Sequence, residues 1–456
     1  SELAELGAVS PLGRGALVWP KERGARCERC DRDFPPMGPL PCLMPDPDAF
    51  RDDVQQSLED YASRTVFSIE SMVERLALAK RPSTLDRIKT AAAAATQASR
   101  ELLGLCAEVQ LVPAKTSAPA WSNVLVANIA TLRDWGWHDG EHEENHRALA
   151  ACLRALHTVE VAPSPRILVL GAGGGRLAFD LHHRLAASAT VATDVNPLPL
   201  LLAERVVRGH SLDWHEFPLA PKRGFPFGQA VRLHGRSEST TGLTFALADG
   251  IRPPFANESF DVVVTPWFID QVVVDTESFV DQVHRLLRAG GVWLNHGPLL
   301  YPKEISLAER WTIDEVVEMA VTQGFRTPVV IEARLPYLTS PYSAQARRED
   351  VYTFAAQRGD EPPSGKPLRP TWQVDHGFPI PRGPKEGWRL APGDPLSVML
   401  EGAIDGRASV RDIGRAVART FGVSTTDACH RVADLLGQAY TLLIDSETVG
   451  TPSKRQ

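Results

Sequence analysis

Residues 166–181, RILVLGAGGGRLAFDL, decide the fold class of this chain. The continuous apolar run at 167–170 predicts a short buried strand. Glycine is needed where the backbone takes a positive φ or lies close to a ligand, and the run is followed by a glycine-rich turn. A helix is predicted from Arg176, and its first free N–H groups point toward the turn. The turn consists of Gly171, Ala172, Gly173, Gly174 and Gly175.

The same alternation of apolar runs and helical segments continues to Phe354. One such segment, FVDQVHRLLRA at 279–289, is expected to be a helix that Gly290 and Gly291 terminate. This alternation predicts a parallel sheet covered by helices, which is a Rossmann-like α/β domain. The further expected strands are ATVATDVN at 189–196, LTFALADG at 243–250, FDVVVTPWF at 260–268 and GGVWLNHG at 290–297.

Acidic residues end two of these strands and sharpen the interpretation of the glycine turn. The order GAGGG departs from the GxGxxG spacing of dinucleotide enzymes. Asp194 ends the second strand, where a carboxylate can bond ribose hydroxyls, and Asp249 ends the third, where one can bond an adenine amino group. Together these features favour an S-adenosylmethionine site over a structural turn. The cofactor-binding candidates here are Gly171, Ala172, Gly173, Gly175, Arg176, Asp194, Asn196, Asp249 and Gly250.

Composition narrows the classes of function. Hydrophobic residues make up 43% and charged residues 23% of the chain, as in globular proteins. A net charge of -7 disfavours a nonspecific nucleic-acid binder, which usually presents a basic face. No run long enough to span a membrane and no signal peptide is recognised, so the cytoplasm is the expected location and no membrane partner is expected.

The N-terminal cysteines form an incomplete metal-binding pattern. Cys27 and Cys30 have the spacing of half a zinc knuckle, but a structural zinc needs four ligands. Residues 10–17 and 31–47 resemble the small zinc-ribbon module found beside some methyltransferases. Ser10 and Gly13 stand where that module has its first cysteine pair. A degenerate, metal-free ribbon is the first choice, and zinc held by Cys27, Cys30, Cys42 and a distant histidine is the alternative.

Five regions are therefore expected along the 456 residues. In the last one, Ser409 or Asp412 is expected to open a helix and Gly422 to close it. Its Ile404-Asp405-Gly406 pattern resembles small helical or winged modules that bind peptides, and a helical appendage or a dimerisation element is the alternative. The regions are a zinc-ribbon-like segment at 1–50, a helical region at 51–160, the donor-binding domain at 161–358, a Pro- and Gly-rich linker at 359–392 and the small helical domain at 393–456.

Two long motifs resemble the carnosine N-methyltransferase family. They are TPWFID at 265–270 and GGVWLNHGPLLY at 290–301, which match the family's FFID and GGxWINxGPLLY stretches. LRDW at 132–135 and HEFP at 215–218 are similar to two further family segments. The resemblance covers about residues 120–356. The sequence departs from the family at Ala130, at Pro302 and in the tyrosine-rich segment, here ARREDVYTF.

The resemblance implies a class I methyltransferase fold that methylates an imidazole nitrogen of a histidine-containing small molecule. It places Arg133 near the cofactor carboxylate and Asp270 near the substrate imidazole. A carboxylate that accepts a hydrogen bond from one imidazole N–H fixes the tautomer and stabilises the developing cation. The alternative for Asp270 is a cap on the turn after the strand.

The remaining catalytic candidates have structural alternatives. His296 and Asn295 lie on or just past the fifth strand, and His296 is either a general base or a scaffold histidine. Trp267, Phe268 and Tyr301 are candidates to wall the pocket, or core aromatics, and for Phe268 the core is favoured. Weaker candidates for a substrate lid are Tyr337, Tyr342 and Tyr352.

The chain is thus predicted to be an S-adenosylmethionine-dependent N-methyltransferase with a small-molecule or peptide substrate. Two alternatives remain: a binding or scaffold protein built on a methyltransferase fold, and a methyltransferase that acts on an oxygen atom. Nucleic acid is not an expected partner. A homodimer or a partner protein joined through the terminal domains is a further option. No metal is assigned.

Overall fold

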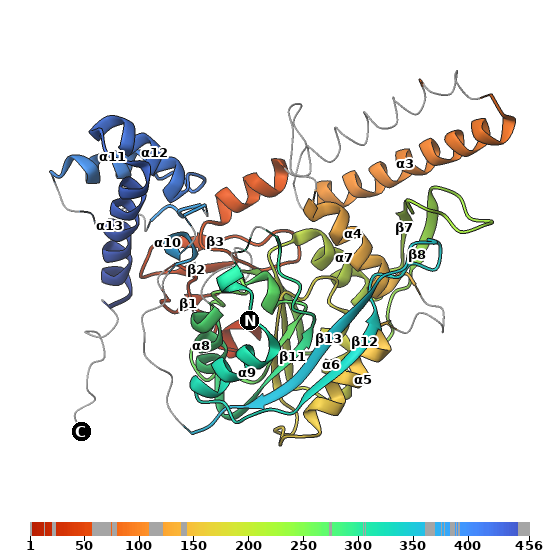
Figure 1. Cartoon of the computed structure of the whole chain (residues 1–456), viewed down its shortest axis with the longest axis horizontal. Coiled ribbons are helices and arrows are strands. Elements are labelled where there is room, and N and C mark those ends of the chain that lie inside the picture. The colour runs from red at the N-terminus through yellow and green to blue at the C-terminus, as the bar shows by residue number, and fades with distance from the viewer. Residues whose placement is uncertain are drawn as a thin grey trace.

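The computed structural model describes residues 2–12, 14–20, 24–56, 74, 80–108, 122–137, 144–272, 276–303, 305, 307–360, 370–374, 376–377, 379–383, 388, 390 and 393–445. Gly13, parts of the helical region expected at 51–160 and much of the expected linker lie outside these residues. At the centre of the fold is a twisted sheet with helices on both faces (Figure 1).

Among the described residues, eight strands form the main sheet, in the order β12-β13-β11-β10-β5-β6-β9-β4. Only β13 runs against its neighbours, between β11 and β12. Apart from β4, this is the topology of the class I methyltransferase fold, and it confirms the expected Rossmann-like domain. The strands are β4 (Cys42–Leu43), β5 (Arg166–Leu170), β6 (Ala189–Asp194), β9 (Leu243–Ala248), β10 (Phe260–Pro266), β11 (Leu287–Gly297), β12 (Val330–Pro336) and β13 (Arg348–Gln357).

Side chains of the central strands point alternately to the two faces, so each face has its own core. Leu168 and Leu170 of β5 belong to one core with helices α8 (Thr276–Leu286) and α9 (Ile313–Thr322). Ile167 and Val169 belong to the other core. Its helices are α4 (Ser122–Trp135), α5 (Glu144–Leu156), α6 (Arg176–Arg184) and α7 (Pro197–Val207). The continuous apolar run at 167–170 therefore reflects a strand buried on both faces.

The boundary between α8 and β11 differs from the expected one. The helix ends at Leu286, and β11 already begins at Leu287, before Gly290 and Gly291. Two backbone bonds extend this part of the chain: Arg358 N donates to Gly291 O at 2.8 Å, and Gly290 N donates to Arg358 O at 3.2 Å. Pairing with the end of β13 outweighs the helical pattern of residues 287–289.

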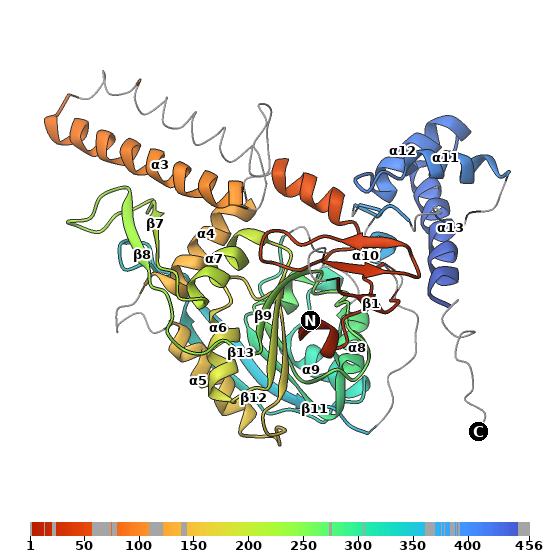
Figure 2. The same ribbon diagram turned by 180° about the vertical axis from the view of Figure 1, so that it is seen from behind.

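The N-terminal strands β1 to β3 and the C-terminal helices lie on the same side of the domain, as two opposite views agree (Figures 1 and 2). The N-terminal segment forms helix α1 (Glu2–Glu5) and a small antiparallel sheet. That sheet consists of β1 (Leu17–Val18), β2 (Ala25–Cys27) and β3 (Arg32–Phe34). The C-terminal segment forms α10 (Thr371–Val374), α11 (Pro395–Ala403), α12 (Val410–Phe421) and α13 (Thr425–Asp445). As expected, Ser409 caps α12 and Gly422 ends it.

The long helix α3 (Pro82–Glu108) projects from the body and packs on the hairpin of β7 (Leu212–Glu216) and β8 (Gln229–Leu233) (Figure 1). His215 Nδ1 lies 3.0 Å from Glu101 Oε2 in this contact. Two short 3-10 turns complete the fold, at Ile269–Gln271 and Leu307–Glu309.

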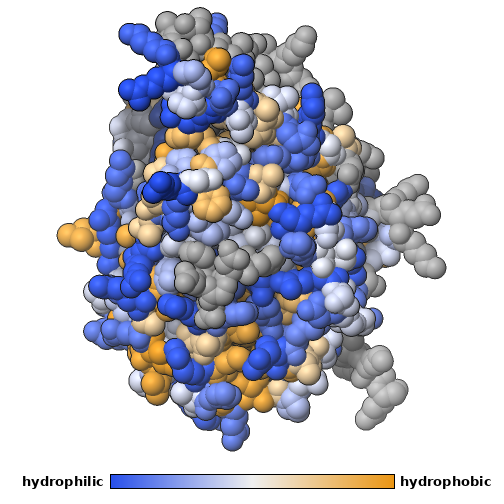
Figure 3. Space-filling view, turned by 90° about the vertical axis from the view of Figure 1, so that its right-hand side faces the viewer, coloured by the Kyte–Doolittle hydropathy of each residue, from blue (hydrophilic) through white to orange (hydrophobic). Residues whose placement is uncertain are grey.

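The side of the molecule in Figure 3 shows apolar side chains interspersed among hydrophilic ones. None of the helices in the described residues is both long and apolar enough to span a bilayer.

Candidate active site

The glycine turn joins β5 to α6 at the carboxyl edge of the sheet, where open α/β folds bind ligands. Gly171 and Gly175 have φ of 67° and 74°, values that other residues rarely adopt. A side chain at Gly171 would collide with the ring of Phe268, and one at Gly175 would lie 2.5 Å from Phe245. Glycine is thus required here by both conformation and packing. Ala172 N donates to Thr193 O at 2.9 Å, which ties the turn to β6.

Asp194 and Asp249 end neighbouring strands of this edge, β6 and β9. Asp194 accepts bonds from Gly173 N and from Asn196 N, both at 2.8 Å, so its carboxylate links the turn to its own strand. Burial raises the pKa of Asp194. Asp249 Oδ1 accepts from Ile251 N at 2.9 Å. Asn196 caps α7 by accepting from Leu198 N at 3.2 Å.

The LRDW segment at the end of α4 packs directly on the glycine turn. Trp135 Nε1 donates to Gly174 O at 2.6 Å, and a side chain at Gly174 would collide with Asp134. Arg133 Nε donates to Asp134 at 2.6 Å, and its Nη1 lies 3.5 Å from Glu144. Burial alone would lower the pKa of Arg133, but these two carboxylates raise it.

The Arg176 side chain bonds to residues of α6 and α4. Its Nε donates to both carboxylate oxygens of Asp180 at 2.9 Å, and its Nη1 donates to the backbone oxygen of Asp134 at 3.1 Å. These bonds join α6 to α4 behind the glycine turn.

Asp270 is buried in the 3-10 turn that follows β10, with 3% of its surface exposed. The side chain does not cap this turn. Instead, its Oδ2 accepts from Leu300 N at 3.0 Å and its Oδ1 from Gln271 Nε2 at 3.2 Å. The first bond joins the WFID segment to the GPLLY segment. Burial raises the pKa of Asp270.

Trp267 and His296 meet where β10 and β11 end. Their ring centroids lie 4.6 Å apart, and the two ring planes make an angle of 80°. Trp267 has a backbone φ of 47°, which is strained for a bulky residue. His296 Nδ1 lies 2.7 Å from Thr353 Oγ1. Burial and the nearby charge of Arg133 lower the pKa of His296 to about 3, so its ring is neutral. Within the described part of the chain, neither His296 Nε2 nor Trp267 Nε1 has a hydrogen-bond partner.

Other aromatic candidates surround Trp267. Tyr337 stacks on the Trp267 ring, with 5.8 Å between the ring centroids. The Arg133 guanidinium carbon lies 5.5 Å from the centroid of the Trp267 ring. Tyr301 is half-buried, which raises its pKa to about 12. Tyr342 packs on Phe225 at 5.2 Å, away from this cluster of ring contacts.

The Asn295 side chain makes hydrogen bonds to the neighbouring strands of the sheet. Its Oδ1 accepts from Thr265 Oγ1 at 3.0 Å, and its Nδ2 donates to Tyr352 O at 3.1 Å. The side chain therefore ties β10, β11 and β13 together, with 3% of its surface exposed.

A cavity of about 490 Å³ opens along the carboxyl edge of the sheet. Four of the predicted cofactor residues line it: Gly171, Asp194, Asp249 and Gly250. The turn after β10 contributes Trp267, Phe268 and Gln271. The other wall comes from the N-terminal segment and the C-terminal helices.

Phe268, for which the core was favoured over the pocket wall, does both: it packs on the core and lines the cavity against Gly171 and Gly250. Two residues beside Arg133 were not predicted. Asp134 adjoins Arg133 in a recognised motif, which was the only available signal. Glu144 is buried beside Arg133, 11 residues along the chain, and no local pattern marks it.

Cys27 ends β2, and Cys30 lies in the turn that leads to β3. Ser10 Oγ is 3.4 Å from Cys30 Sγ, and Cys30 N donates to Cys27 Sγ at 3.5 Å. A hydrogen bond with the Cys30 thiol lowers the pKa of Cys27. Cys42 instead lies in β4 of the main sheet. Among the described residues, no three His, Cys, Asp or Glu side chains are grouped to hold a metal ion.

Comparison with known proteins identifies the second half of this domain. Residues 231–358 match the family model described as carnosine N-methyltransferase. The matched region holds the WFID and GPLLY segments, whose contact through Asp270 and Leu300 is described above.

Curated carnosine N-methyltransferases from Rattus norvegicus and Mus musculus are each 33% identical over 106 residues. The match spans 22% of this chain and only about a quarter of the relatives, 26% of their length.

Two solved structures are also similar to this chain. Phosphoethanolamine N-methyltransferase 2 from Haemonchus contortus, in complex with S-adenosyl-L-methionine, is 16% identical. Its match covers 52% of this chain and 56% of its own, with a TM-score of 0.34. A SAM-dependent methyltransferase from Methanosarcina mazei is 15% identical. That match covers 45% and 97% of the two chains, with a TM-score of 0.32. The fold class rests on the strand order of this chain.

Proposed function

We propose that this chain is an S-adenosylmethionine-dependent N-methyltransferase that methylates an imidazole nitrogen of a histidine-containing small molecule or peptide. One observation carries the proposal: the glycine turn, the two strand-end carboxylates and the turn of the WFID segment line one cavity. The match of residues 231–358 to the carnosine N-methyltransferase family model supports the same chemistry.

The residues of the cavity fit the methyl donor. Gly171 and Gly250 line the cavity beside the Phe268 ring, and the Asp194 and Asp249 carboxylates can accept bonds from ribose hydroxyls and an adenine amino group. Arg133 would meet the donor's carboxylate from α4. When bound, the donor supplies a methyl group already activated by its sulfonium. The protein must therefore chiefly position the acceptor, at about 3–3.5 Å from the carbon.

Asp270 is the proposed orienting group on the acceptor side. Its two known bonds leave acceptor capacity on both oxygens, because a carboxylate has about four lone-pair sites. A substrate imidazole that donates one N–H to Asp270 presents the lone pair of its other nitrogen. Transfer leaves a positive charge on the ring, which the ionised carboxylate stabilises.

Neutral His296 and Trp267 complete the proposed acceptor pocket, with Tyr301 beside Asp270. Because its ring is neutral and its lowered pKa makes it a weak base, His296 is proposed to act as a hydrogen-bonding group toward the substrate. Asn295 is proposed to support this wall from the sheet.

The test of this proposal compares donor binding with methyl transfer. Calorimetry with S-adenosylhomocysteine is expected to show binding, and labelled methyl transfer is to be assayed on carnosine, histidine and histidine-containing peptides. Asp270→Asn is expected to lower transfer about a hundredfold or more with unchanged affinity for S-adenosylhomocysteine.

The matched control is Asp314→Asn at an exposed position of α9, which should leave both measurements unchanged. Full activity of Asp270→Asn would remove this residue from the mechanism. A wild-type chain that does not bind S-adenosylhomocysteine would favour a scaffold protein. Fragmentation of the product by mass spectrometry identifies the methylated atom and so tests the alternative of oxygen as the acceptor.

A further inference from the structure

Strand β4 adds an eighth strand to the methyltransferase sheet, next to β9. The two strands are parallel, with Leu43 opposite Ala248. Because parallel strands end at the same edge of a sheet, the loop that begins at Met44 leaves that edge beside Asp249. The N-terminal segment thus adds residues 44–50, a short loop and the first turn of a helix that begins at Pro47, to the rim of the cofactor cavity, and Met44 and Phe50 line it.

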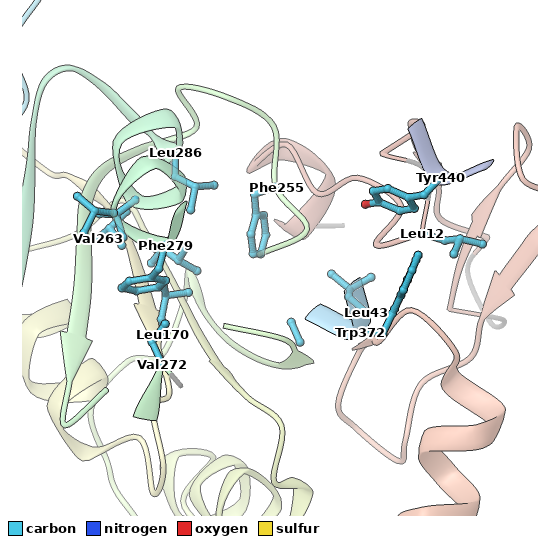
Figure 4. Close-up of a cluster of buried hydrophobic side chains, with 14 of the residues drawn as sticks. Leu12, Leu43, Leu170, Phe255, Val263, Val272, Phe279, Leu286, Trp372 and Tyr440 are labelled. Carbon is cyan, nitrogen blue, oxygen red and sulfur yellow. The ribbon is translucent and has the colours of Figure 1, made fainter. Parts of the chain in front are cut away.

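The C-terminal module reaches the same edge. Arg252 follows shortly after Asp249, and its Nη1 donates to the hydroxyl of Tyr440 at 3.1 Å. The Arg252 guanidinium also lies 5.5 Å from the Tyr440 ring. Trp372 packs edge-on against Tyr440 at 6.2 Å. Both aromatic side chains line the cavity, and Figure 4 shows them grouped with Leu12 and Leu43 of the N-terminal segment.

Asp46 holds the two terminal segments together. Arg382 donates to its carboxylate from N, Nε and Nη2, each at 2.9 Å, and Arg32 Nη2 lies 3.5 Å away. Only 6% of the Asp46 surface is exposed. Residues 44–50 and the C-terminal segment are therefore held together as one wall of the cavity.

We propose that this wall completes the adenosine site. The inference rests on the proposed function. The adenine ring would lie between the end of β9 and residues 44–50, with Trp372 and Tyr440 on its outer side. The wall is rich in apolar and aromatic side chains, which suit a flat heteroaromatic base: Leu12, Leu43, Met44, Phe50, Trp372 and Tyr440.

The C-terminal helices accordingly act as part of the donor site, and binding of the donor stabilises their attachment. A ligand that contacts both parts stabilises the joined state in proportion to its occupancy. Adenosine alone, which lacks the amino-acid half of the donor, should depend on this wall as strongly as the complete product does.

The experiment measures the affinity of the full chain for S-adenosylhomocysteine and for adenosine by calorimetry. Trp372→Ala is expected to raise the dissociation constant of both ligands by a similar factor, about tenfold. Leu442→Ala is the matched control, because this exposed residue lies on the same helix as Tyr440 and should leave both constants unchanged.

A measurement on the wild-type chain avoids any effect of misfolding. S-adenosylhomocysteine should slow the hydrogen exchange of the backbone amides in residues 44–50 and around Trp372 and Tyr440. If the wild type binds the product while Trp372→Ala binds it equally well and exchange is unchanged, the wall does not hold adenosine. Absence of product binding to the wild type would instead overturn the proposed function, and the wall with it.

Discussion

At the scale of single residues, Phe268 shapes the floor of the candidate site. Its ring occupies the space that side chains at Gly171 and Gly250 would need. Gly171 is constrained twice, because its φ is also positive. At Gly250 packing alone excludes a side chain, since an added Cβ would lie 2.7 Å from Phe268 Cζ.

The packing of Gly250 can be tested with a double-mutant cycle. Gly250→Ala should destabilise the chain by about 1–3 kcal/mol, because a well-packed ring must shift. In a Phe268→Leu background the same change should cost at least about 0.5 kcal/mol less, because the clash is relieved. The apparent melting temperatures of the four proteins provide the measurement. Strictly additive shifts would contradict direct packing between the two positions.

At the scale of elements, the helices differ in what stabilises them. Helix α12 has a capping box, in which Ser409 Oγ accepts from Asp412 N and Asp412 Oδ2 accepts from Ser409 N, both at 3.1 Å. Helix α3 lies partly in solvent and contains Gly104, whose Cβ position is open on all sides. This glycine meets no packing requirement, so it only reduces the stability of its helix.

Gly104→Ala should therefore stabilise α3 by about 0.5–1 kcal/mol, because alanine loses less backbone entropy in a helix. Slower hydrogen exchange of the α3 amides would report this gain. Gly136→Ala at the end of α4 is the contrasting variant, since its Cβ would lie 2.7 Å from Val231 Cγ1 and should destabilise. Faster exchange in Gly104→Ala would show that this position has a contact or conformation not recognised here.

At the scale of the whole molecule, the two terminal segments are joined through Asp46. Burial by itself raises the pKa of this carboxyl, but the bonds from Arg382 and the charge of Arg32 bring it below its ordinary value. A lowered folded-state pKa contributes stability that is complete above the unfolded pKa, near 3.9, and is lost as the pH falls through the folded value.

Asp46→Asn should lower the melting temperature at neutral pH, with a loss of about 1–3 kcal/mol as the bonds to a charged acceptor are weakened. The difference from wild type should shrink as the pH falls below about 4, because the wild-type carboxyl is then protonated as well. Asp48→Asn is the control, since Asp48 is 66% exposed and lies 3.7 Å from Arg382. A constant difference at all pH values would contradict the role of this charge.

The sequence by itself determined the strand, glycine turn and helix of residues 166–181, together with the acidic strand ends. These features follow from local rules: apolar runs, positive φ at glycine and the order of elements along the chain. The caps of α12 were predictable for the same reason. The family motifs brought Arg133 and Asp270 into consideration, and their partners then emerged from the structure.

Only the tertiary structure decided what encloses the cavity. Leu43 pairs with Ala248, and Asp46 meets Arg382, although roughly two to three hundred residues separate them in each case. No periodicity or spacing marks such pairs, because the contact depends on how the sheet edge and the C-terminal helices come together. The same holds for Trp372 and Tyr440, which resemble ordinary core aromatics until the fold places them beside Asp249.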